Sequence, residues 1–274
     1  MYEIPISVAM NAKLIGCGEQ TVVLSHGYGA NQSIWDNILP ILAQTYRVLL
    51  FDWSFSSTIQ HPQLFDSFNN SSFTAFADDL ISLSDEMNLK NTVFIGHSMA
   101  GMIGCIASVK RPDIFTQLIL IGSSPRYLNE KNYEGGFNKD EVDNILSNIE
   151  SNFETWAINF ATLTVGANNP NSVEKFGKNL QRMRPEVALS VARIVFLSDQ
   201  RDVLEKVELP CTIIQCSNDI VVPNSVANFM QSKIKGKTSI EIIETDGHFP
   251  QLTAHEMLIK VLQRVIISSP KEIN

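Results

Sequence analysis

The chain has 274 residues, of which 44% are apolar and 18% are charged, and its 21 Lys and Arg against 29 Asp and Glu give a net charge of −8. This composition is typical of a globular protein and argues against disorder, while the acidic balance argues against a surface that tracks nucleic-acid phosphates. Apolar runs such as Thr21–Leu24 and Gln117–Ile121 are far shorter than the roughly 20 residues that span a bilayer, so we expect no membrane segment.

Short apolar runs alternate with helical patterns along the chain. The predicted strands, in order, are Ala12–Ile15 as an extra N-terminal strand, Gln20–Ser25, Tyr46–Asp52, Asn91–Gly96, Thr116–Gly122, Pro210–Cys216 and Thr238–Glu244. The helical patterns are Ser33–Ala43, Ser72–Met87, Ser98–Lys110, Asn224–Ile234 and His255–Ile267. The six main strand runs are continuous in Val, Ile and Leu, as expected of strands buried on both faces. The alternation therefore predicts an α/β fold, with a mostly parallel sheet and helices on both of its faces.

One gap, between Gly122 and Pro210, is too long for a single crossover and too patterned for a structureless loop. It contains two apolar helical stretches, which are the face formed by Phe153, Trp156, Phe160 and Leu163 and the run Val187–Leu197. These faces either pack the insertion onto the sheet or line a pocket, and both interpretations stay open. We predict a helical insertion over residues 127–208 within a core of residues 1–126 and 209–274.

The strongest local signal is the string Gly96–Gly101, at the turn from a predicted strand into a predicted helix. A serine on so sharp a turn projects its hydroxyl above the sheet, and small residues on either side let the strand and the helix approach closely. The usual pattern is Gly-x-Ser-x-Gly, and here Ala100 takes the second small position. The context predicts Ser98 as a nucleophile, whereas the alternative is a serine that only caps the helix.

An acid and a histidine follow in the order that this architecture requires, after the last two predicted strands. We predict that Asp219 orients His248 and fixes its tautomer, and that His248 takes the proton from Ser98 and returns it to the leaving group. Asp246 is a rival for the acid, although its place two residues before His248 is typical of a turn residue.

The string Ser25–Gly29 directly follows the strand Gln20–Ser25. A tetrahedral oxyanion needs two backbone donors, and we predict that the N–H groups of Tyr28 and Met99 supply them as an oxyanion hole. The alternative is a plain strand-to-helix loop in which glycine adopts a positive φ.

The N-terminal residues and the cysteine spacings both argue against secretion. The N-terminal residues Met1–Pro5 lack a charged region before a long apolar core, so we expect no signal peptide. The four cysteines have spacings that fit neither a zinc site nor a disulfide framework; they are Cys17, Cys105, Cys211 and Cys216. A reducing setting, cytoplasmic or nuclear, is therefore expected.

Nine short strings, spread over nearly the whole chain, carry a more specific signal. They are His26–Gly29, Gln32–Trp35, Gly96–Met99, Arg111–Asp113, Ser124–Tyr127, Gly135–Phe137, Met183–Pro185, Ser217–Asp219 and Gly247–Pro250. Together they resemble the strigolactone and karrikin receptor family of plant α/β-hydrolases. The resemblance implies an α/β-hydrolase fold whose insertion is a four-helix lid over an apolar pocket.

The resemblance also implies roles for individual residues. By matching motif, Ser98, His248 and Asp219 are the catalytic triad, and Tyr28 stands where the family usually has Phe. Substrate-binding positions on the wall or rim of the pocket are Tyr28, His97, Phe137, Ile145, Trp156, Phe160, Phe196, Val221 and Phe249. So aromatic a wall favours neutral, apolar ligands of modest size. This chemistry needs no metal or cofactor, and we expect none.

The sequence departs from the main receptor clades at Phe51–Ser57, where those clades carry a Gly-containing loop. The string Asp52–Ser56 resembles instead the clade of DWARF-FOURTEEN-LIKE-TWO proteins. We expect Trp53 and Phe55 to narrow the ligand pocket, because their rings replace the room that glycine leaves. The alternative is that both rings pack in the core beneath the loop.

The function predicted from these observations is slow hydrolysis of small apolar butenolide lactones or esters by a serine hydrolase. Two alternatives are a ligand-sensing receptor with incidental hydrolysis and a general carboxylesterase. In the receptor clades the resemblance implies an F-box leucine-rich-repeat protein and a Clp-ATPase-like repressor as partners. We expect a monomer, in the cytoplasm and the nucleus, that binds a butenolide ligand and neither nucleic acid nor a membrane.

Overall fold

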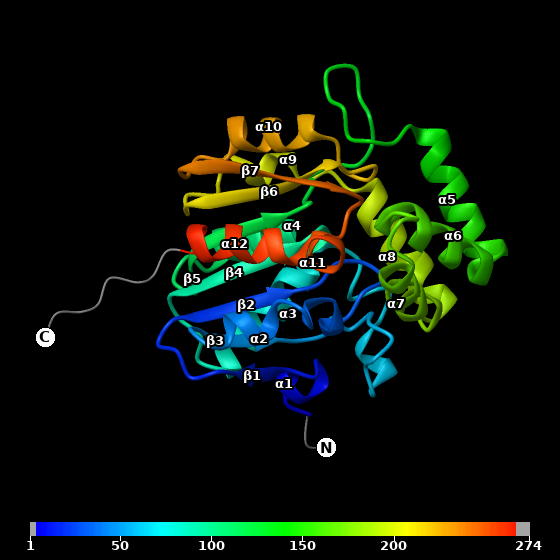
Figure 1. The fold of residues 1–274 in the computed structure, drawn as a ribbon. Coiled ribbons are helices and arrows are strands. Elements are labelled where there is room, and N and C mark those ends of the chain that lie inside the picture. The colour runs from blue at the N-terminus through cyan, green and yellow to red at the C-terminus, as the bar shows by residue number, and fades with distance from the viewer. Residues whose placement is uncertain (1–3, 267–274) are drawn as a thin grey trace, which may run out of the picture.

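A seven-stranded sheet organises the computed structural model, which describes residues 4–266 (Figure 1). The strand order is β1-β3-β2-β4-β5-β6-β7, with β1 antiparallel to β3 and every other neighbouring pair parallel. The strands are β1 (Lys13–Ile15), β2 (Thr21–Ser25), β3 (Arg47–Leu50), β4 (Thr92–His97), β5 (Phe115–Ile121), β6 (Cys211–Asn218) and β7 (Thr238–Asp246). Helices pack on both faces of the sheet, so the predicted fold class is confirmed.

The central strands are buried because helices cover both sides of them. Every residue of β2 and of β4 is buried, which explains their continuous apolar sequences. β7 is the outer strand, and among its residues only Ile243 is buried. β6 and β7 each run two residues further than predicted, and a register irregularity between Cys216 and Asn218 pairs Asn218 with Asp246. This extension carries the chain to the edge of the sheet where the loops after both strands meet.

Four of the five helical patterns predicted for the core form helices in the structure, and two short helices, at Ile6–Ala9 and Pro250–Thr253, were not predicted. The helices on the sheet are α1 (Ile6–Ala9), α2 (Leu39–Leu42), α3 (Phe73–Glu86), α4 (Met99–Lys110), α10 (Asn224–Lys233), α11 (Pro250–Thr253) and α12 (His255–Val265), with short 3-10 turns at η1 (Gln32–Trp35) and η2 (Pro62–Leu64). The hydroxyl of Ser72 caps α3 by accepting the N–H of Ala75 at 3.2 Å, and α3 packs against α4. Among the described residues, no helix is long and apolar enough to cross a membrane.

The continuous helix predicted over Ser33–Ala43 is wrong. The segment forms η1 and then, after a break, the single turn α2. Pro40 explains the break, because its ring has no N–H to bond back to Asp36 and clashes with the carbonyl four residues earlier. Residue 267, the end of the helix predicted from His255, lies outside the described residues, as do residues 1–3 and 268–274 of the predicted core.

A four-helix insertion leaves the sheet after β5 and returns to it before β6. Its helices, called the lid below, are α5 (Lys139–Ser151), α6 (Phe153–Val165), α7 (Pro170–Gln181) and α8 (Pro185–Leu197), and the short α9 (Arg201–Leu204) follows. α6 packs along α7 and α5 along α8, and the lid stands to one side of the sheet (Figure 1). The structure thus contains the four predicted helices of the insertion, whereas their function as a lid and the exact boundaries at 126/127 and 208/209 remain predictions.

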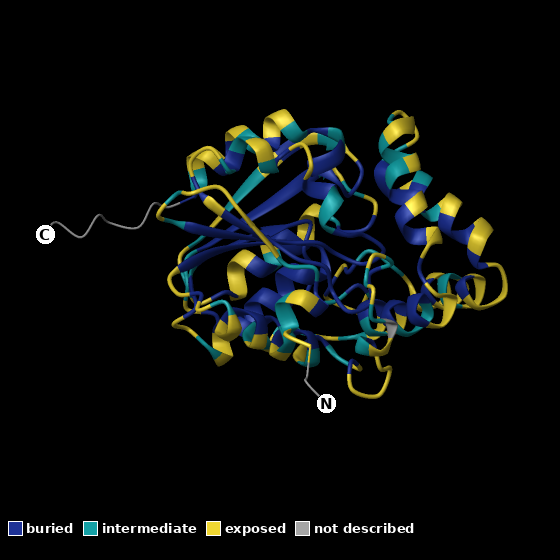
Figure 2. Cartoon of the chain, turned by 90° about the horizontal axis from the view of Figure 1, so that it is seen from below, coloured by how far each residue is buried: buried dark blue, intermediate teal, exposed yellow. Residues whose placement is uncertain are grey.

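The lid helices bury one side and expose the other, as Figure 2 shows. In α6, Phe153 and Trp156 are buried and Phe160 is partly buried, but Leu163 is 62% exposed, so its predicted place on this face is wrong. At 100° per residue, the stripe through Phe153 and Phe160 continues to Thr164 rather than to Leu163. Thr164 is 1% exposed, in agreement with this geometry.

Three contacts join the beginning and the end of the insertion. The guanidinium of Arg126 lies 2.8 Å from the Asp199 carboxylate, and the N–H of Gln200 donates to the Pro125 carbonyl at 2.7 Å. Arg201 lies 2.8 Å from Glu130. The two chain crossings between the core and the lid are thereby held side by side.

Candidate active site

Ser98 sits at the junction of β4 and α4 in a strained backbone conformation. Its φ of 56° and ψ of −126° lie outside the regions that a residue with a side chain normally adopts. A Cβ atom on Gly96 would lie 2.7 Å from the backbone nitrogen of Gly101, so the strand and the helix meet closely at this turn. This is the geometry of a nucleophile elbow.

His248 and Asp219 come together at the ends of β7 and β6. The Nδ1 atom of His248 lies 2.7 Å from Oδ2 of Asp219, and both side chains are buried. Because a carboxylate only accepts hydrogen bonds, Nδ1 carries the proton and Nε2 is the unprotonated nitrogen, as the predicted role of a base requires.

The Asp219 carboxylate is held by further donors. Its Oδ1 atom accepts the N–H groups of Val221 and Val222 at 2.8 and 3.1 Å, and its Oδ2 atom accepts the amide of Gln215 at 3.2 Å. By contrast, Asp246 is exposed and accepts the Asn218 amide at 2.8 Å. The geometry therefore favours Asp219 over Asp246 as the partner of His248.

Tyr127 contacts Ser98 and was missed by the sequence analysis as a site residue. Its hydroxyl lies 3.3 Å from Oγ of Ser98, whereas Nε2 of His248 is buried and has no hydrogen-bond partner among residues 4–266. Burial raises the pKa of Tyr127, so its phenol stays protonated and can donate to Oγ. Proton transfer to His248 therefore requires Oγ to turn from Tyr127 toward Nε2. The only signal in the sequence was the place of Tyr127 in the family string Ser124–Tyr127.

His97 supports the loop that carries His248. Its Nε2 atom donates to the backbone carbonyl of His248 at 2.9 Å, and its ring packs on Phe249 with centroids 4.7 Å apart. Burial, reinforced by the proximity of His248, holds the pKa of His97 well below its usual value. His97 is thus a neutral structural donor beside Ser98.

The predicted oxyanion loop packs directly against the elbow. A Cβ atom on Gly27 would lie 2.9 Å from Cβ of Ser98 and 3.0 Å from the carbonyl oxygen of His97, so only glycine permits this approach. Tyr28 donates its hydroxyl to the Ala188 carbonyl of α8 at 3.0 Å, which ties the loop to the lid. Met99 is the first residue of α4, where backbone N–H groups have no acceptor within the helix. The use of the Tyr28 and Met99 amides as an oxyanion hole stays a prediction.

A small cavity of about 20 Å³ lies over Ser98 and His248. Its walls are Tyr28, His97, Ser98, Tyr127, Phe160, Thr164, Phe176, Val195, Phe196, Val221, His248 and Phe249. Such a volume holds about one water molecule, so a larger ligand enters only if the lid moves. The ring of Phe176 packs on Phe249 with centroids 4.3 Å apart, and this contact between lid and core closes one side of the cavity.

Three residues predicted to line the pocket stand behind its wall instead. Phe137 packs edge-on against Phe196 with centroids 5.4 Å apart, and Trp156 stacks on Phe160 at 4.9 Å. Ile145 is partly buried against the core and does not reach the cavity. In both aromatic pairs the second ring lines the cavity and the predicted residue packs on that ring, so a substrate-binding role of the predicted residue stays a prediction.

The aromatic loop after β3 does not narrow this cavity, so that prediction is wrong. Trp53 and Phe55 are 0% and 2% exposed, and neither lines the cavity over Ser98. The Trp53 ring packs edge-on against Phe51 and Phe76, with centroids 4.9 and 5.8 Å apart. The loop fills the core, as the alternative interpretation held.

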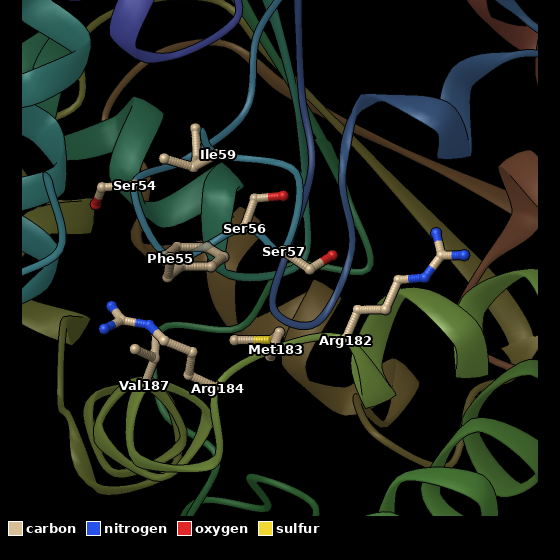
Figure 3. Close-up of a pocket in the computed structure, with 9 residues that line it drawn as sticks. All are labelled: Ser54, Phe55, Ser56, Ser57, Ile59, Arg182, Met183, Arg184 and Val187. Carbon is tan, nitrogen blue, oxygen red and sulfur yellow. The ribbon is translucent and has the colours of Figure 1, made fainter. Parts of the chain in front are cut away.

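The same loop borders a separate pocket of about 130 Å³ on the side of α8 (Figure 3). Its lining is Ser54, Phe55, Ser56, Ser57, Ile59, Arg182, Met183, Arg184 and Val187. Figure 3 shows the guanidinium groups of Arg182 and Arg184 extended in opposite directions rather than converging on one point. Within the described part of the chain, no group of three or more His, Cys, Asp or Glu side chains is placed to hold a metal ion.

Comparison with known proteins gives one family and a consistent set of relatives. Residues 20–254 match the family model described as the alpha/beta hydrolase fold. The chain is 42% identical to a strigolactone esterase of Arabidopsis thaliana, over 94% of this chain and 96% of that protein. It is 38% identical to a karrikin insensitive 2 receptor of Petunia hybrida, over 95% and 97% of the two chains. A solved hydrolase from Oleispira antarctica superposes with a TM-score of 0.91 at 28% identity, over 94% of this chain and 95% of that one.

Proposed function

This chain belongs to the α/β-hydrolase family and, within it, to the family of strigolactone esterases and karrikin receptors, and on that basis we propose that it is a serine hydrolase of small apolar butenolide esters or lactones. The observation that carries the proposal is the contact of His248 with Asp219 next to the strained Ser98 turn, inside an apolar cavity. This combination provides a nucleophile and an oriented base beside an apolar binding site.

In the proposed reaction, Ser98 Oγ attacks the carbonyl carbon while Nε2 of His248 takes its proton. The negative charge that develops on the carbonyl oxygen is stabilised by the N–H groups of Tyr28 and Met99. His248 then protonates the leaving group, and a water molecule activated by the same nitrogen releases the acyl group from Ser98. Asp219 stabilises the imidazolium form of His248 during both steps.

The test is incubation of the purified protein with a panel of butenolides and simple alkyl esters, with mass spectrometry of the products and of the intact protein. Butenolide cleavage with a transient acyl adduct on Ser98 supports the proposal. Faster turnover of the simple alkyl esters than of any butenolide identifies a general carboxylesterase instead. No product and no adduct with any member of the panel refutes hydrolysis.

Charged substrates should be rejected. Most of the cavity wall is aromatic or aliphatic, and the hydroxyls of Tyr28 and Thr164 already donate to backbone carbonyls. An anionic ester would lose its hydration without gaining a partner, so we expect kcat/KM at least about tenfold below that of the neutral analogue of the same size. Parallel kinetics on the matched neutral and anionic esters measure this ratio, and equal values would contradict the apolar site.

A second candidate is a ligand sensor in which hydrolysis is slow. The small volume of the cavity favours it, because a ligand larger than a water molecule then enters only if the lid moves, which is the change that a sensor transmits. For this candidate we propose an F-box leucine-rich-repeat protein and a Clp-ATPase-like repressor as partners. Near-single turnover with ligand-dependent pull-down of these partners would support sensing, whereas fast multiple turnover without pull-down would leave an enzyme alone.

A further inference from the structure

The aromatic loop after β3 is bonded to the loop that precedes the predicted oxyanion donor. His26 is completely buried, and Trp53 makes two hydrogen bonds to it. The backbone N–H of Trp53 donates to Nε2 of the His26 ring at 3.2 Å. The indole N–H of Trp53 donates to the backbone carbonyl of His26 at 2.9 Å.

The bonds of the His26 ring determine its protonation. An amide N–H only donates, so Nε2 of His26 must be the unprotonated nitrogen that accepts from Trp53. Nδ1 lies 2.9 Å from the carbonyl oxygen of Gly27, which only accepts, so Nδ1 carries the proton. Burial also lowers the pKa of His26, so the ring is neutral and held in one tautomer.

The carbonyl of Gly27 and the N–H of Tyr28 belong to the same peptide group. The Nδ1–H of His26 therefore donates to the oxygen of the peptide whose N–H is the predicted oxyanion donor. Because a peptide group is planar, fixing its oxygen also fixes the direction of its N–H. Donation to the oxygen further polarises the N–H and strengthens it as a donor.

Asp52, the residue before Trp53, binds the far end of the loop that contains Tyr28. Oδ1 of Asp52 accepts the N–H of Gln32 at 2.8 Å, and its Oδ2 accepts the Gln32 side-chain amide at 2.9 Å. Phe55 packs edge-on against the His26 ring, with centroids 5.9 Å apart. Residues 26 and 32, on either side of Tyr28, are thus both bound to the segment 52–55.

We propose that Trp53 is a positioning residue for catalysis, whose indole N–H holds His26 and, through it, the Gly27–Tyr28 peptide at the oxyanion. The inference rests on the proposed hydrolase function. It gives the aromatic loop a role in stabilising the transition state, distinct from the shape of the ligand pocket.

The chain offers a matched pair of tryptophans for the test. Trp53 and Trp35 are both 0% exposed, but Nε1 of Trp35 has no hydrogen-bond partner among residues 4–266. Trp53→Phe removes an aromatic N–H that holds the loop, whereas Trp35→Phe removes a similar volume and no hydrogen bond. A third variant carries β-(3-benzothienyl)alanine at position 53, which keeps the bicyclic shape and replaces the N–H with sulfur.

We expect Trp53→Phe to lower kcat about 10- to 100-fold, since loss of one oxyanion donor costs about 10²- to 10³-fold and here the donor is only displaced. KM should change less than about twofold, because the pocket wall is untouched. In Trp53→Phe, the rate at which a fluorophosphonate labels Ser98 should fall by the same factor as kcat. The benzothienylalanine variant should show the same losses in kcat and in labelling rate as Trp53→Phe. Trp35→Phe should keep the wild-type kcat, even if its melting temperature falls as much as that of Trp53→Phe.

Other outcomes distinguish a failure of the proposed hydrolase function from a failure of the positioning role of Trp53. If the wild-type protein is not labelled at Ser98 at all, the proposed function fails. If the wild-type protein is labelled and either position-53 variant reacts at the same rate, only the positioning role of Trp53 is refuted. A loss of kcat in Trp35→Phe equal to that in Trp53→Phe would also refute it, because the effect would then come from lost packing.

Discussion

Ser98→Ala should abolish hydrolysis of every ester and lactone substrate, with a loss of about 10³-fold or more in kcat. The variant removes the only atom that can form the acyl adduct while leaving His248 bonded to Asp219. The melting temperature should stay unchanged within a few degrees, because within residues 4–266 the hydroxyl makes a single hydrogen bond, with Tyr127 at 3.3 Å. Steady-state kinetics and thermal unfolding measure the two effects.

Ser84→Ala is the matched control for this variant. Ser84 is also buried, but it lies in α3, donates its hydroxyl to the Leu80 carbonyl at 2.7 Å and does not line the cavity over Ser98. It should keep full activity and lose some stability. A folded Ser98→Ala protein that still turns over substrate at the wild-type rate would rule out the serine mechanism.

Asp219→Asn should lower kcat by about 10³- to 10⁴-fold with little change in KM. A side-chain amide can donate to Nδ1 of His248, and this bond would favour the tautomer with the proton on Nε2. That tautomer cannot accept the proton of Ser98. The loss should appear in the rate of acylation, which a single-turnover experiment isolates from substrate binding.

Asp246→Asn provides the comparison within the same loop region. Asp246 is exposed and bonds to Asn218, so its replacement should change kcat by less than about twofold. If Asp246→Asn proved the more damaging of the two, Asp219 would not be the acid of the triad.

Local patterns in the sequence were enough to predict the order of the strands along the chain and the candidate catalytic residues of this protein. Continuous apolar runs gave the strands, the strand-to-helix turn singled out Ser98, and the order of the later loops singled out Asp219 and His248. These features are local because a buried strand and a tight turn each impose their own residue types. The helix break before Pro40 was missed, although proline acts on its own turn and the break is therefore local as well.

The tertiary structure alone decided which side chains meet. Phe160 and Phe196 form the cavity wall while Trp156 and Phe137 stand behind them, because rings from distant segments compete for the same volume. The contact between Tyr127 and Ser98 joins residues from two different loops, and no spacing along the chain encodes it.

For the aromatic loop after β3, the sequence likewise showed which residues are present, and the tertiary structure decided where they lie. Its composition was visible in the sequence, and both a pocket and a core position were compatible with the large rings of Trp53 and Phe55. The direction of Trp53 depends on the acceptors that the folded chain offers its indole N–H, and the His26 carbonyl lies 2.9 Å away on the neighbouring strand end. A buried donor must find such a partner, so the fold, rather than the local sequence, turned this ring away from the ligand cavity and toward the oxyanion loop.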